Sequence, residues 1–116
     1  MPTTILFQSP QGGTQIPAGQ PAILTTLDVS NNKNLRITYK HSNGNGSVTA
    51  TAKILHEAQG NNSNLVLATL DAVTLNNLQT VTRRHTDFLG RRLRIEASVS
   101  VPDFPQNIIV IVLGDS

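Results

Sequence analysis

The chain of 116 residues contains no cysteine and no tryptophan, and aromatic residues make up only 3% of it. The absence of cysteine excludes disulfide bonds, thiolate metal sites and thiol nucleophiles. Because aromatic side chains are so few, the core must be aliphatic, and there are few rings on which sugars or single-stranded bases could stack. Nucleic acid is therefore disfavoured as a partner.

Charged residues are also few, at 14% of the sequence, and the formal net charge is only +2. A charge this mild does not by itself indicate a polyanionic partner. No apolar run reaches the length of a transmembrane helix, and residues 1–4 lack the basic start and apolar core of a signal peptide. We therefore predict no membrane span, and we do not expect export through the standard secretory route.

Short segments of alternating apolar and polar residues, separated by turn formers, occupy most of the chain. This alternation is typical of strands with one buried face, and no segment shows the periodicity of a helix of two turns. About eight strands are predicted, over residues 4–8, 22–29, 35–41, 47–54, 65–70, 78–84, 92–101 and 108–113. We therefore predict one all-β domain over residues 1–116, a two-sheet antiparallel sandwich in which a jelly roll is favoured over an immunoglobulin-like arrangement.

Two local patterns add to this prediction. Residues 43–46, Asn-Gly-Asn-Gly, form a strong hairpin signal between the strands that flank them. Residues 65–70 are apolar on both faces apart from Thr69, which predicts a central strand, and residues 71–77 are interpreted as an irregular link.

The last predicted strand, residues 108–113, is apolar at every position. Because successive side chains of a strand point to opposite faces, both of its faces need apolar cover. One face can lie on the chain's own core, and we expect a neighbouring copy to cover the other. The predicted assembly interface consists of Ile109, Ile111 and Leu113 on that second face, with Ile5, Leu6 and Phe7 of the first strand.

The first strand is short, terminal and followed by the breaker-rich residues 9–13, Ser-Pro-Gln-Gly-Gly. Such a strand can pair within its own sheet or reach a neighbouring subunit. Residues 1–16 are therefore a candidate N-terminal assembly segment.

Five of the nine Lys and Arg residues fall close together, namely Arg83, Arg84, Arg91, Arg92 and Arg94. If residues 78–84 and 92–101 form a hairpin, these side chains gather at one end of the sandwich, where arginine forks can hold carboxylate, phosphate or sulfate. Three explanations stay open. The arginines can be a solvated edge that discourages unwanted strand pairing, a contact to an acidic patch on another subunit, or a site for an anionic glycan or nucleic acid.

No pattern in the sequence indicates catalysis. His41, His56 and His85 lie far apart, without the close spacings of a metal site, and are predicted to lie at the surface. No serine stands in a nucleophile elbow, no glycine-rich loop suits a phosphate, and no pair of carboxylates is suggested. We therefore expect a protein that is not an enzyme and that uses neither a metal nor a cofactor.

Residues 17–30, Pro-Ala-Gly-Gln-Pro-Ala-Ile-Leu-Thr-Thr-Leu-Asp-Val-Ser, are followed by Leu-Arg-Ile at residues 35–37 and by Arg-Arg-Leu-Arg-Ile-Glu-Ala at residues 91–97. In these stretches, and in its rhythm of strands and turns, the chain resembles small jelly-roll proteins of spore-forming bacteria, among them the pilin-like subunits of endospore appendages. The resemblance implies a self-assembling extracellular fibre subunit whose N-terminal segment contacts the preceding subunits and whose sheets extend across the joint.

The chain departs from this family in one respect. The appendage subunits carry N-terminal cysteines that form disulfides between subunits, and residues 1–20 contain none. Any fibre of this chain would therefore be held by sheet pairing and apolar contact.

Two functional hypotheses follow, from different classes. In the first, the protein is a structural, self-associating subunit of an extracellular filament, appendage or coat at a cell, spore or virion surface, and its partner is a copy of itself. In the second, it is a non-catalytic module that binds an anionic glycan or another anionic surface through the arginines of residues 83–94.

Overall fold

The computed structural model describes residues 3–17, 21–28, 34–43, 46–55, 66–76, 78–86, 92–99 and 106–115, and the statements below concern these residues. All regular structure in these ranges is β-strand. The strands are β1 (Thr3–Gln8), β2 (Thr14–Ile16), β3 (Ala22–Asp28), β4 (Asn34–Asn43), β5 (Val48–Leu55), β6 (Val66–Leu75), β7 (Thr80–His85), β8 (Arg92–Val99) and β9 (Gln106–Asp115).

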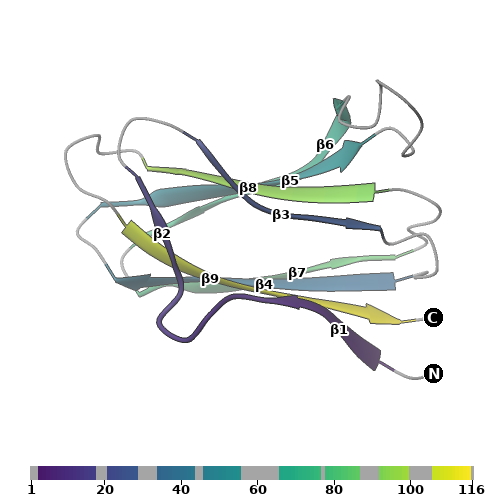
Figure 1. Ribbon diagram of the computed structural model, residues 1–116, viewed down its shortest axis with the longest axis horizontal. Coiled ribbons are helices and arrows are strands. Elements are labelled where there is room, and N and C mark those ends of the chain that lie inside the picture. Colours follow the sequence, from purple (N-terminus) through teal and green to yellow (C-terminus); the bar gives the residue numbers. More distant parts are fainter. Residues whose placement is uncertain are drawn as a thin grey trace.

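The strands form two stacked sheets in which all pairings are antiparallel. Sheet A has the order β1-β9-β4-β7, with β2 also paired to β9, and sheet B has the order β3-β8-β5-β6. Figure 1 shows the two sheets on edge, with sheet B above sheet A and with β6 and β7 on the far side. The predicted two-sheet antiparallel sandwich is confirmed.

The order of the strands can be compared with the two topologies that the sequence left open. From β2 to β9, every connection except β5–β6 passes from one sheet to the other. An immunoglobulin-like sandwich would place its first two strands side by side in one sheet. Here β1 and β2 are two parts of one edge along β9, and the next strand, β3, lies in the opposite sheet. This order favours the jelly roll.

Two local predictions and one omission need correction. β4 and β5, which flank the Asn-Gly-Asn-Gly sequence, lie in different sheets, because the chain reverses there across the core and not within a sheet. β6 is an edge strand and continues to Leu75, so residues 71–75 are not a link; two register shifts against β5 change which of its side chains face the core. The short strand β2 was not predicted.

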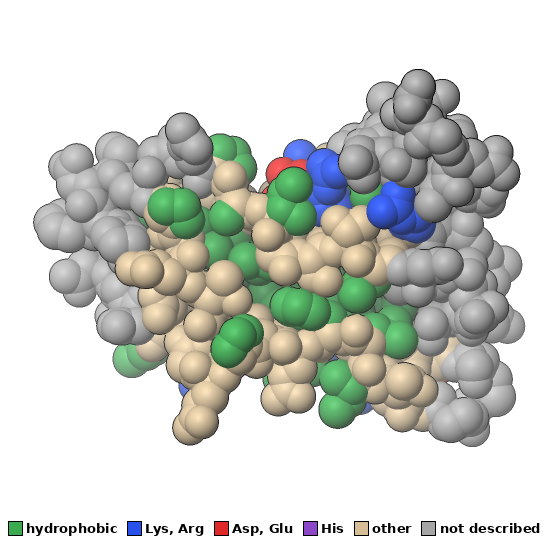
Figure 2. All heavy atoms as spheres, viewed as in Figure 1, with side chains coloured by type: hydrophobic (Ala, Val, Ile, Leu, Met, Phe, Trp, Pro, Cys, Tyr) green, Lys and Arg blue, Asp and Glu red, His purple; other side chains and the backbone are tan. Residues whose placement is uncertain are grey.

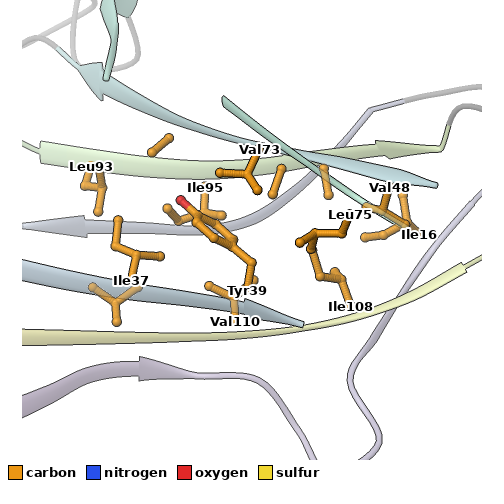
Figure 3. Packing of buried hydrophobic residues seen from close by; sticks show 14 of the residues in the cluster. Ile16, Ile37, Tyr39, Val48, Val73, Leu75, Leu93, Ile95, Ile108 and Val110 are labelled. Atoms are coloured by element: carbon orange, nitrogen blue, oxygen red, sulfur yellow. The ribbon is translucent and has the colours of Figure 1, made fainter. Parts of the chain in front are cut away.

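The core lies between the sheets and is built from alternate residues of the strands. The fully or almost fully buried members are Ile16, Leu35, Ile37, Tyr39, Val48, Ala50, Ala52, Val73, Leu75, Leu93, Ile95, Ala97, Ile108, Val110 and Val112. Figure 3 shows Tyr39 extending from β4 across the space between the sheets. Burial raises the pKa of the Tyr39 hydroxyl well above its usual range, and the negative charge of Asp71 adds to this effect.

β9 is an inner strand of sheet A, with a neighbour on each side. β4 pairs with it along almost its whole length, while β1 and β2 pair with its two ends on the other side. Between β1 and β2, the N–H of Ser9 donates to the carbonyl of Val110 at 3.0 Å, and the N–H of Val110 donates to Ser9 Oγ at 2.9 Å. The first strand therefore pairs within its own chain.

Two glycines carry the chain from β1 to β2 in a backbone conformation that other residues rarely adopt. Gly12 and Gly13 have φ angles of 83° and 90°. A Cβ on Gly13 would lie 2.8 Å from the carbonyl oxygen of Ile108 and 2.8 Å from Ser42 Oγ, whereas a Cβ on Gly12 would meet nothing within 4 Å. Only Gly13 is therefore required for a close approach to β9.

This difference predicts unequal effects for the same substitution at adjacent positions. Gly12→Ala should lower the free energy of unfolding by about 1 kcal/mol, the cost of a positive φ. Gly13→Ala should cost roughly a further 1–3 kcal/mol, because backbone at β9 must shift to admit the methyl group. Urea unfolding of both variants measures the difference, and equal losses would contradict the close approach at Gly13.

Candidate functional site

The outer face of β9 carries a row of apolar side chains that the core does not use. Burial alternates along the strand, so that Ile108, Val110 and Val112 are fully buried on the inner face. Ile109, Ile111 and Leu113 point to the outer face and are half-buried. The predicted division of this segment into two apolar faces is confirmed, and its second face is partly open to solvent in the single chain.

Neighbouring strands extend this row on one side and limit it on the other. On β1, Ile5 lies opposite Leu113 and is 61% exposed. On β4, the partners of Ile109, Ile111 and Leu113 are all polar, namely Lys40, Thr38 and Arg36. We call Ile5, Ile109, Ile111 and Leu113 the apolar stripe.

The three N-terminal residues predicted for the interface do not point the same way. A register shift between Ile5 and Phe7 interrupts the pairing of β1 with β9. As a result, Leu6 and Phe7 are half-buried and pack against the core, while Ile5 stays on the outer face. Of this triplet, only Ile5 belongs to the stripe.

The predicted arginine cluster is divided between the two sheets. β7 pairs with β4 in sheet A, and β8 lies between β3 and β5 in sheet B, so the hairpin that would gather the arginines does not form. Arg83 and Arg84 therefore lie in sheet A, and Arg92 and Arg94 lie in sheet B. Arg91 is outside the described residues.

Two of these arginines form ion pairs within the sandwich itself. Arg83 shares the inner face with Ile37, its partner on β4, and its Nε lies 3.3 Å from Oδ2 of Asp71 on β6, which joins the two sheets at their far edge. Arg94 NH1 lies 3.3 Å from Glu96 Oε2 on the same strand. Arg83 and Arg94 therefore have counter-charges within the chain itself.

Glu96 is shared by two cations on the outer face of sheet B. Lys53 Nζ donates to its Oε1 at 2.9 Å, and Arg94 donates to its Oε2. Burial alone would raise the pKa of Glu96, but the hydrogen bonds and charges of Lys53 and Arg94 together lower it below its usual value. The group is therefore ionised and paired at neutral pH.

Sheet A brings together two arginines whose proximity the sequence did not predict. Arg36 on β4 and Arg84 on β7 are direct cross-strand partners, and both are exposed on the outer face. They line an open hollow of about 250 Å³ together with Asn34, His85, Thr86 and Asp115. Residues this far apart in sequence become neighbours only through the pairing of β4 with β7.

The prediction that the histidines lie at the surface is wrong for His41. It is fully buried at the end of β4, where its Nε2 and Oε1 of the equally buried Gln106 are 2.8 Å apart. His41 lies two positions after Tyr39 and therefore shares its inner face. His85 is half-buried, burial lowers its pKa, and His56 is outside the described residues.

The described residues offer neither a metal site nor a membrane helix. No group of three or more His, Asp and Glu side chains in the described ranges could hold a metal ion. Within the same ranges, no helix is long and apolar enough to cross a membrane.

Comparisons with known proteins support the fold. No protein-family model and no curated protein matches the sequence. The chain is similar to a solved structure of Bacillus endospore appendages, described as a novel family of disulfide-linked pili, with a TM-score of 0.52 and 12% identity over 97% of this chain and 88% of that one. The expected resemblance to endospore appendage subunits is thereby supported at the level of the fold.

A second solved structure belongs to the infectious bursal disease virus Gx strain. It matches 96% of this chain but only 30% of its own, with 11% identity and a TM-score of 0.46.

The shared carboxylate of Glu96 predicts a pH-dependent contribution to stability. Because its folded pKa is lowered, the contribution is present above the unfolded pKa and is lost as the pH falls through the folded value. At pH 7, Glu96→Gln should lower the free energy of unfolding by about 1–3 kcal/mol. Urea unfolding from pH 7 down to pH 2 should show the variant and the original chain converging.

The control is Lys40→Gln, which removes an exposed cation that has no ion-pair partner in the described part of the chain. It should leave stability within about 0.5 kcal/mol of the original at every pH. A loss for Glu96→Gln that persists unchanged at pH 2 would show that packing, and not charge, is responsible.

Proposed function

We propose that the protein is a structural subunit that assembles with copies of itself into an extracellular filament, appendage or coat. The apolar stripe on the outer face of sheet A carries this proposal. Its four side chains lie outside a core that is already closed on the inner face of β9. Folding of one chain therefore does not account for a row of isoleucine and leucine at these positions.

When two copies associate, the apolar stripe of one copy would pack face to face against a sheet of the other copy. Strands present flat rows of side chains, and sheets stack face to face about 10 Å apart with their apolar residues interdigitated. Each Å² of apolar surface removed from water contributes roughly 25 cal/mol. A second copy is the occupant we favour, because a subunit with this fold forms pili in the Bacillus endospore appendages.

Strand addition is the second component of the proposal, and the edge strand β3 supports it. Edge strands are commonly protected by charge, proline or irregular pairing. β7 carries Arg83 and Arg84, the β1–β2 edge is interrupted at residues 9–13, and β6 has two register shifts. β3 has one register shift, between Ile23 and Thr25, and ends at Asp28, but it contains no Lys, Arg or Pro. One side of its backbone has no neighbouring strand in sheet B among the described residues.

The side chains near β3 are also incompletely covered. Ala22, Leu24 and Leu27 pack against the core but are only partly buried. Figure 2 views this edge of the sandwich and shows hydrophobic side chains between the two sheets. An added strand from a neighbouring copy would pair with the β3 backbone and cover part of this apolar surface.

The double substitution Ile109→Thr and Ile111→Thr tests the stripe. Threonine keeps the β-branched shape that suits a strand but replaces a large part of the apolar surface with a hydroxyl. We expect the original chain to form oligomers or fibres at tens of micromolar and the double variant to remain largely monomeric. Light scattering after size exclusion and negative-stain microscopy measure both.

Leu78→Asn is the matched control, because Leu78 is 64% exposed, lies outside both the stripe and β3, and has a positive φ that asparagine tolerates. The exchange leaves the stripe and β3 in place and should not change association. A monodisperse monomer for the original chain would refute self-assembly, and equal effects of the control and the double variant would refute the role of the stripe.

Strand addition predicts a further signal in the backbone of β3. Amide hydrogens without a partner strand exchange rapidly, and pairing with a neighbouring copy slows their exchange. Raising the protein concentration into the assembled range should therefore protect residues 22–28 more than residues 80–85 of the charged edge strand β7. Equal protection of the two edges would argue against addition at β3.

A further inference from the structure

The hollow at the end of sheet A brings together two cations that form no ion pair with any residue the structure describes. Arg36 and Arg84 are cross-strand partners on the outer face, and like charges placed directly opposite each other destabilise a sheet. Neither forms an ion pair within the described part of the chain. This pair differs from Arg83 and Arg94, each of which has a carboxylate within 3.3 Å.

Among the described residues that line the hollow, Asp115 carries the carboxylate, and a residue of another strand binds it. Asp115 lies at the end of β9, and its Oδ1 accepts a hydrogen bond of 2.7 Å from the hydroxyl of Thr3 on β1. β1 and β4 lie on opposite sides of β9, so this bond ties the carboxylate on the side away from the arginines. Asp115 therefore forms no ion pair with Arg36 or Arg84 in the described part of the chain, and its single negative charge offsets only one of their two positive charges.

His85 adds no charge to the hollow near neutral pH. Burial lowers its pKa, against the opposing effect of Asp71. The net positive charge of the hollow therefore comes from the guanidinium groups of Arg36 and Arg84.

We propose that this hollow binds a phosphate or sulfate group between Arg36 and Arg84. A guanidinium presents a planar fork of donors, and one fork already occupies both oxygens of a carboxylate. A tetrahedral group has further oxygens, so it can accept a fork from each of two facing arginines. The open volume of about 250 Å³ leaves room for such a group, whether free or as an ester at the end of a larger molecule.

The proposal is tested by titrating the ¹⁵N-labelled chain with sodium phosphate and sodium sulfate against sodium chloride at equal ionic strength. We expect saturable shifts of the amide signals of residues 34–36, 84–86 and 115. Arg36→Gln and Arg84→Gln should each weaken binding about tenfold, as expected when a charge-assisted hydrogen-bonding group is lost. Arg84→Lys should weaken it as well, because an ammonium group cannot form the fork.

Lys40→Gln is the matched control for charge. Lys40 is an exposed cation on the same face of β4, but it does not line the hollow. Its removal should change the affinity less than about twofold, since exposed charges at this distance are largely screened by salt. Thermal unfolding without added anion verifies that every variant is folded.

Titration with dextran sulfate, and with dextran as its blank, distinguishes a group carried on a polymer from a free ion. Polymer binding that needs Arg36 and Arg84 but not Lys40 supports the ester as the source, and saturable binding of the inorganic ions supports the free group. Three results would overturn the proposal: no arginine-dependent binding of any of these anions, binding of acetate as tight as that of phosphate, or an equal loss in Lys40→Gln. The titrations are made in the Ile109→Thr and Ile111→Thr double variant, which we expect to remain largely monomeric, so that their outcome is separate from that of self-assembly.

Discussion

The fold depends on β9 acting as an inner strand with a pairing partner on each side. It joins the N-terminal edge, β1 and β2, to β4, and its inner face closes the core with Ile108, Val110 and Val112. A strand in this position cannot hide its second row of side chains, because that row points away from the sandwich. The same pairing that completes the sheet therefore places Ile109, Ile111 and Leu113 on its outer surface.

Alternation in the sequence was sufficient to locate most strands and their inner faces. Leu35, Ile37 and Tyr39 alternate with polar residues in the predicted strand 35–41, and each is at most 2% exposed. Alternation does not say which strands pair, because the period of two is the same for a neighbour in the same sheet and for one in the opposite sheet. The Asn-Gly-Asn-Gly turn shows this limit, since the same reversal can close a hairpin or cross the core.

The candidate site was predictable only where it is local in sequence. The outer face of β9 followed from one apolar run, whereas the pairing of Arg36 with Arg84 depends on β4 lying beside β7, which no local pattern encodes. His41 is a different case. Its position two residues after Tyr39 gave it the parity of the core face, and the polar character of the residue alone led to the wrong prediction.

The charged residues on the two outer faces of the sandwich differ in whether they form ion pairs. On sheet B, Lys53 and Arg94 share the carboxylate of Glu96, so each of these cations has a counter-charge within the chain. On sheet A, Arg36 and Lys40 lie opposite members of the apolar stripe and have no ion pair among the described residues. Hydrated cations beside exposed isoleucines disfavour nonspecific association. Any contact that buries the stripe must also keep Arg36 and Lys40 solvated or neutralise their charges. If the stripe joins copies of the chain, an anion between Arg36 and Arg84 would lower the electrostatic cost of that contact, and the two surfaces would be thermodynamically linked.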